Sequence, residues 1–140
     1  MRAEFNAFKA ELAVPSVLNN RVFTAVRVTD AGELVRDNYA VTIPYLPELD
    51  DKRYTAPQTA NSAELCEFDV RFVGTTADAV LLLLDAALEH MLFRVLTIPG
   101  RVCDPIRVDR TANDRAGMQF DKSARLFYID ATFVFTSRSA

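Results

Sequence analysis

The chain of 140 residues is 50% apolar and 25% charged, a composition typical of one globular domain that builds its core without disulfide bonds. Its 16 basic and 19 acidic side chains give a formal net charge of −3. Proteins that hold DNA tightly carry an excess of positive charge, so this balance excludes tight nucleic-acid binding as the main function.

The N-terminal segment is predicted to form a short helix over residues 1–14. Phe5, Phe8 and Leu12 recur at the spacing of one helix face, and Pro15 marks the end. The segment mixes acids and bases among its apolar residues and lacks the continuous hydrophobic stretch of a signal peptide. We therefore expect a cytosolic product.

Residues 21–46 predict a hairpin, because two alternating runs flank a turn that contains Gly32. The second run places Tyr39, Val41 and Ile43 on one face of its strand. The polar stretch that follows, residues 47–63, is predicted to be a long loop. Loops above about 12–15 residues are usually functional or disordered, so this loop is the first candidate for contact with a partner.

The segment 75–93 is the most apolar part of the chain and is predicted to be a helix. Its longest uninterrupted apolar run is only Ala79–Leu84, whereas a membrane span needs roughly 20 such residues, so no membrane contact is expected. Thr75 or Thr76 can cap the N-terminus of this helix, and Asp78 in the first turn suits the positive end of its dipole.

The polar stripe of this helix is narrow. Asp78, Asp85 and Glu89 fall close together around the helix axis, and most of the remaining circumference is apolar. One sheet would cover only part of that apolar surface, which also includes Leu82 and Leu92. We therefore expect a second covering surface, either the first helix or another subunit.

Three further strands are predicted. Residues 64–74 alternate apolar and charged side chains, and residues 101–109 and 126–137 form a C-terminal hairpin. Pro105 places the first strand of that hairpin at an edge or at a bulge, because proline cannot donate to a ladder. The connection between these two strands mixes acids and bases and is predicted to be a solvated loop.

Together these elements predict a single α+β domain over residues 1–140. The expected sheet is largely antiparallel or mixed, has about five strands, and carries two helices on one face. No internal repeat and no domain boundary is seen in the sequence.

The residues that carry chemistry are few. His90, the one histidine, lies on the apolar helix and is predicted to be a boundary or subunit-contact residue. Cys66 and Cys103 are too few for a disulfide scaffold and lie in no CxxC spacing, which is typical of a reducing compartment. We expect no catalytic residue, no metal site, and neither a cofactor nor a glycine-rich phosphate loop.

The runs "KRYTAPQTANSAELCEFDVRFVGTTADAVLLLLDAAL", "IPGRVCDPIRVD" and "LFYIDATFVFTS" carry a family resemblance. Together they resemble the tail terminator, or tail completion, proteins of long-tailed bacteriophages. The positions that match are Tyr39 with Val41, Arg53 with Tyr54, Val73 with Gly74, Thr76 with Ala79, Pro99–Arg101, and Phe127–Phe135.

The resemblance implies a structural protein of the virion that forms a six-membered ring. Such a ring caps the finished tail tube, ends its polymerisation and joins the tail to the head, at the tail-neck junction. Its partners would be further copies of this chain, the tail tube protein and a head-completion or connector protein. DNA would pass through the ring without sequence-specific binding, and assembly would take place in the host cytoplasm.

Candidate contacts follow from these interpretations. Two loops supply candidate contacts to another subunit or to the tube: Arg53, Tyr54, Pro57 and Gln58 in the first, and Arg110 and Arg115 in the second. The apolar helix supplies a possible ring interface at Asp85, Glu89 and His90. Two alternatives stay open: another neck or head-tail adaptor protein, and a small-molecule-binding domain or cryptic enzyme.

Overall fold

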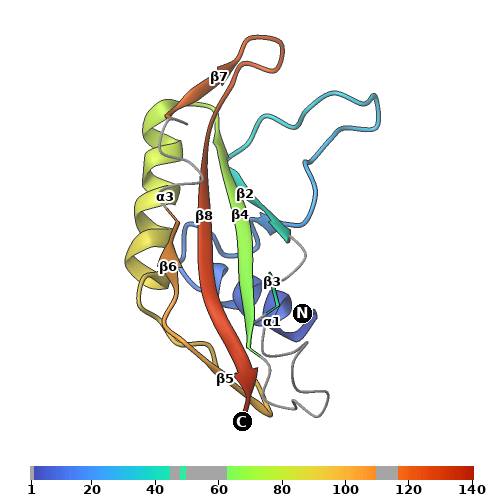
Figure 1. Ribbon diagram of the computed structural model, residues 1–140. Helices are drawn as coiled ribbons and strands as arrows, with labels where there is room; N and C mark the ends of the chain where they lie inside the picture. Colours follow the sequence, from blue (N-terminus) through green and yellow to red (C-terminus); the bar gives the residue numbers. More distant parts are fainter. Residues whose placement is uncertain (1, 45–47, 50–62, 110–116) are drawn as a thin grey trace.

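The computed structural model of the chain describes all residues except 1, 45–47, 50–62 and 110–116 (Figure 1). In chain order the elements are α1 (Arg2–Leu12), β1 (Val22–Phe23), β2 (Tyr39–Pro44), β3 (Glu48–Leu49), β4 (Glu64–Gly74), α3 (Ala77–Met91), β5 (Arg101–Cys103), β6 (Arg107–Val108), β7 (Gln119–Asp121) and β8 (Leu126–Ser139).

Strands β4 and β8 form the centre of one sheet, pairing antiparallel along their whole common length (Figure 1). On the outer side of β4, β2 pairs antiparallel, β1 pairs parallel with β2, and β3 covers the start of β4. On the outer side of β8, three short strands, β5, β6 and β7, each pair antiparallel with it. The described residues thus form a largely antiparallel sheet with one parallel pair.

The two helices among the described residues, α1 and α3, lie on the same face of this sheet, which confirms the predicted α+β class. Alternation along β4 points Phe68 and its neighbours two residues away toward the helices, and Phe133 of β8 lies opposite Phe68 on that face. Phe8 of α1 packs against both of these rings, with centroids 4.9 Å and 5.6 Å away. One main core therefore lies between the sheet and the helices.

Helix α3 begins and ends close to the predicted limits. Thr76 is the N-cap, and its side-chain oxygen accepts a hydrogen bond from the backbone N–H of Ala79 at 3.2 Å. The side chains buried against the sheet are Val80, Leu83, Ala87 and Met91. Among the described residues, no helix is both long enough and apolar enough to cross a membrane.

A close approach explains the glycine that joins β4 to α3. A Cβ at Gly74 would lie 2.9 Å from Cγ2 of Val80 and 3.1 Å from Oδ1 of Asn38. That Asn38 oxygen accepts a hydrogen bond from the N–H of Thr75 at 3.1 Å, so the polar neighbour is held in place. Glycine is therefore the residue that lets α3 begin directly above the end of β4.

The opposite face of the sheet is more polar. A small cluster of Tyr39, Val41, Val73 and Leu126 is buried there, at the end where β2 meets β4. Beyond it, Arg71 forms a two-point ion pair with Asp130, with N–O distances of 2.8 Å and 3.0 Å. Its guanidinium carbon lies 4.4 Å from the ring centroid of Tyr128, which helps to hold the side chain flat on the sheet.

The predicted hairpin over residues 21–46 is wrong in its pairing. Only Val22 and Phe23 form a strand from the first run, and they pair parallel, not antiparallel, with the second. An isolated antiparallel bridge joins Val28 to Leu34 around the expected turn. Since Val28 is exposed, its run has no surface on which to bury one alternating face, and pairing stops after a single bridge.

The C-terminal region agrees with the sequence in part. The stretch 101–109 does pair with 126–137, and Pro105 does interrupt it, leaving β5 and β6 as separate strands. The solvated loop predicted after this stretch is wrong near its end, where β7 forms a tight hairpin with β8. Phe120 of β7 packs against Phe127 in a tilted arrangement with ring centroids 4.7 Å apart, a contact that the loop-like composition of the segment did not predict.

Candidate interaction surfaces

The candidate contacts from the two loops lie outside the described residues. This applies to all six: Arg53, Tyr54, Pro57, Gln58, Arg110 and Arg115. They remain predictions from the sequence. The three candidates on α3, by contrast, are placed by the structure.

His90 contacts the first helix of its own chain. Its Nε2 lies 2.9 Å from Oε2 of Glu11, and the ring is half-buried between α3 and α1. Arg94 completes this contact, because its Nη1 lies 3.7 Å from the same Glu11 oxygen and its Nε donates to the His90 carbonyl at 3.1 Å. His90 therefore links two helices of the same subunit.

Asp85 and Glu89 lie on the opposite, outward side of α3 and are exposed. Within the part of the chain that the structure describes, neither carboxylate has an ion-pair partner. Their spacing of four residues places like charges one helical turn apart, an arrangement that destabilises a helix by about 0.2–0.5 kcal/mol. An external cation would relieve that repulsion.

Helix α1 is one of the two surfaces expected to cover α3 in addition to the sheet, but it covers only one flank of that helix. Leu81 and Leu82 remain 42% and 59% exposed. Just beyond the helix, Phe93 is 72% exposed, although its backbone N–H donates to the Ile106 carbonyl at 2.8 Å and fixes its position. Apolar surface therefore remains on the side of α3 that neither α1 nor the sheet covers.

A shallow pocket of about 380 Å³ lies on that same side. Its walls come from the end of α3 and from β6: Leu88, Leu92, Phe93, Arg107 and Val108. The lining is apolar apart from the Arg107 side chain, which suits an apolar side chain of a partner better than a polar small molecule.

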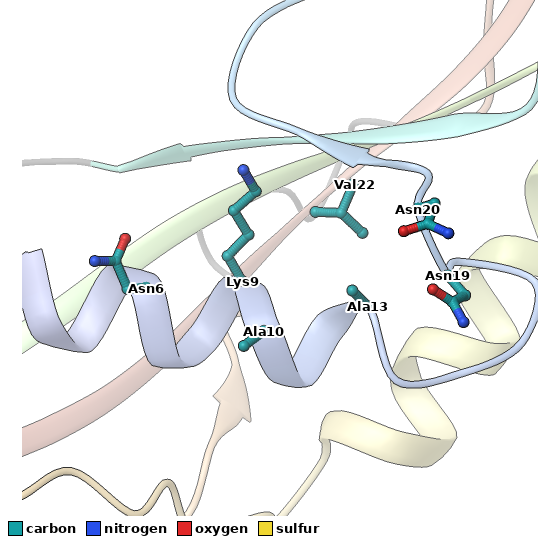
Figure 2. A pocket seen from close by; sticks show the side chains of 7 residues that line it. All are labelled: Asn6, Lys9, Ala10, Ala13, Asn19, Asn20 and Val22. Atoms are coloured by element: carbon teal, nitrogen blue, oxygen red, sulfur yellow. The ribbon is translucent and has the colours of Figure 1, made fainter.

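A second pocket, of about 300 Å³, lies between α1 and the segment that leads into β1 (Figure 2). Figure 2 shows Asn6 and Lys9 projecting from α1, with Asn19, Asn20 and Val22 on the neighbouring segment at the other side of the pocket. Amide groups and one ammonium group can hydrogen-bond a polar ligand or a polypeptide backbone. These side chains offer binding groups without a paired nucleophile and base.

The two thiols are buried and protonated near neutral pH. Burial raises the pKa of the Cys66 thiol to about 12, and the charges of Glu4 and Glu64 add to this effect. Burial also raises the pKa of Cys103. Since the thiolate is the reactive form of cysteine, neither residue is suited to nucleophilic chemistry. No group of three or more metal-ligating side chains is present in the described ranges.

A buried polar cluster anchors the start of α1 to the sheet. Ser137 of β8 donates its hydroxyl proton to Oε1 of Glu4 at 3.0 Å, and Nε of Arg101 lies 3.2 Å from the same oxygen. Burial acts to raise the pKa of Glu4, but hydrogen bonds, including the one from Ser137, outweigh it, and the pKa is lowered overall. The arrangement is structural, since it ties three elements together beneath the core.

Comparison with known proteins adds one finding. No protein-family model matches the sequence, and no curated protein sequence matches it either. The structure does resemble a chain from a solved structure titled "Virion of native gene transfer agent (GTA) particle", with a TM-score of 0.63. The match covers 96% of this chain and 91% of that chain at 12% sequence identity, which shows likeness of fold.

Proposed function

We propose that this protein is a structural subunit of a phage-like virion. The observation that carries the proposal is the likeness of fold, at a TM-score of 0.63, to a chain of a gene transfer agent virion. The likeness extends over 96% of this chain and 91% of that one, so the two chains share a whole domain. The resemblance of the sequence to tail terminator proteins supports the same class of protein.

Within that class, we propose that copies of the chain form a ring at the tail-neck junction. The ring would cap the tail tube, end its polymerisation and join the tail to the head through a head-completion or connector protein. Exposed apolar side chains on α3 and just beyond it, among them Leu82 and Phe93, support an assembly role, because they are suited to burial against a neighbour.

The net charge of −3 also fits a ring through which DNA slides. Many basic contacts to phosphate would hold the DNA in place, because each neutralised phosphate strengthens binding by counterion release. An acidic subunit allows passage without sequence-specific binding. The six-fold ring remains part of the proposal and is measured directly in the second experiment below.

The first experiment is deletion of the gene from its phage, with plasmid complementation as the control. We expect separate heads and tails, with tubes of uncontrolled length, by negative-stain imaging. Unjoined tails of normal length would instead identify another neck or head-tail adaptor protein. Normal joined particles in the deletion strain would refute both virion roles.

The second experiment is native mass measurement of the purified protein over a range of concentrations. A closed ring of about six subunits is the expected result.

A third experiment tests the alternative of a small-molecule-binding domain or cryptic enzyme. Loss of virion production in His90→Ala or Cys66→Ser, while folding and assembly stay intact, would indicate that alternative.

A further inference from the structure

The outward side of α3 carries both apolar and acidic groups. We define this outer face of α3 by Asp78, Leu81, Leu82, Asp85 and Glu89, which are all exposed. Its carboxylates have no ion-pair partner within the described ranges. Since the buried side chains of α3 lie on its other side, this face is turned away from the sheet, beside which α3 runs in Figure 1. The face is therefore suited to a partner that brings positive charge together with an apolar group.

The same chain carries such a group at the end of its sheet. The hairpin of β7 and β8 extends beyond the sheet at the end opposite the C-terminus (Figure 1). Lys122 and Arg125 lie in its turn, and Phe120, which is 49% exposed, precedes them on β7. We call these three residues the basic tip. Both cations are exposed and lack ion-pair partners in the residues that the structure describes.

The turn of this hairpin is held in one shape. Oδ1 of Asp121 accepts hydrogen bonds from the N–H groups of Ser123 and Ala124 at 2.9 Å and 3.1 Å. Arg125 has φ of 55°, which turns the chain back into β8. The Asp121 carboxylate thus accepts hydrogen bonds from backbone N–H groups of the turn, whereas the Lys122 and Arg125 side chains are exposed on an ordered element.

We propose that the outer face of α3 in one subunit binds the basic tip of a second copy of this chain. The inference deepens the proposed ring function and rests on it. Complementary charge identifies the occupant, because both halves of the contact belong to this one sequence and neither has an ion-pair partner among the described residues of its own subunit. In the proposed ring this contact is head-to-tail, because a head-to-tail contact that repeats around an axis closes into a ring, whereas the same contact made twice between two copies would stop at a dimer.

Charge reversal tests the contact. One variant carries Asp85→Lys with Glu89→Lys, and the other carries Lys122→Glu with Arg125→Glu. Each is expected to weaken self-association at least about tenfold in low salt, measured by sedimentation, and the loss should shrink as salt rises. The exposed Asp30, which lies in the turn between Val28 and Leu34, supplies the control Asp30→Lys, which should leave association unchanged.

Restoration is the decisive part of the test. A variant with all four reversals should associate like the wild type, because every contact is again complementary. An equal mixture of the two variants should also form rings of even number, in which the two subunits alternate. If both reversals leave self-association unchanged, or if neither combination restores it, the proposal is overturned.

Complementation of the gene deletion tests the same contact if the protein assembles into a ring only on its tail tube and stays monomeric when purified. The same variants are supplied in place of the wild type, and joined particles are counted. Loss in each variant and recovery with four reversals supports the contact between copies, whereas loss without recovery indicates that a different virion protein binds these patches and overturns the proposal. Normal particles in the deletion strain itself would refute the ring function and leave the contact between copies to be judged by sedimentation.

Discussion

Removing the ring of Phe8 tests whether α1 is an integral part of the core. The side chain is fully buried and packs on Phe68 and Phe133 at centroid distances of 4.9 Å and 5.6 Å. Phe8→Ala deletes this ring from between the helix and the sheet, and such changes cost about 3–5 kcal/mol of unfolding free energy. A domain of this kind has roughly 5–15 kcal/mol in total, so the variant loses a large fraction of it.

Urea unfolding followed by circular dichroism measures this loss. A lower midpoint with an unchanged slope is expected, together with a melting temperature reduced by roughly 10–20 °C. Val14→Ala is the matched control, because Val14 is exposed just after the same helix, and its effect should stay within about 0.5 kcal/mol. A loss below about 1 kcal/mol for Phe8→Ala would show that α1 does not cover the sheet in solution.

Three further outcomes follow from other parts of the fold. Thr76→Ala removes the N-cap acceptor of α3 and should cost about 1 kcal/mol in urea unfolding, whereas Thr76→Ser should cost much less; equal losses would contradict the capping role. The pKa of Glu4 is lowered in the folded protein, so its contribution to stability is present above its ordinary value of 4.5 and is lost as the pH falls through the lower folded pKa. In Glu4→Gln the unfolding free energy should fall less between pH 7 and pH 3 than in the wild type, and an unchanged pH dependence would contradict this assignment. Since the pKa of Cys66 is raised to about 12, iodoacetamide at pH 8 should modify it only after denaturant is added, as measured by mass; rapid modification of the native protein would show that the thiol is accessible.

Some of the fold follows from local pattern alone. The strict alternation in residues 64–74 and 126–137 predicts the two central strands, because a strand that buries one face needs an apolar residue at every second position. Thr76 and the narrow polar stripe of Asp78, Asp85 and Glu89 predict α3 in the same way. These signals lie within one element, so the sequence is enough to detect them.

Pairing between distant segments required the tertiary structure. The alternating run after Arg21 has the pattern of a strand, yet it pairs over only two residues, because the rest of the run finds no surface to cover. The segment containing Phe120 has the composition of a loop, yet it pairs with β8, where the Phe120 ring packs against the Phe127 ring. At such places the secondary-structure propensity of the segment is weak, and its tertiary contacts decide whether it forms a strand.

The candidate surfaces divide in the same way. The sequence by itself determined that α3 has more apolar surface than one sheet can cover, and that Asp85 and Glu89 share its polar stripe, because helical spacing fixes both. Only the tertiary structure decided that His90 turns inward to Glu11, 79 residues away in the chain, and that Lys122 and Arg125 lie in an ordered turn at one end of the sheet. Such relations depend on which elements pack together, which is a property of the whole folded chain.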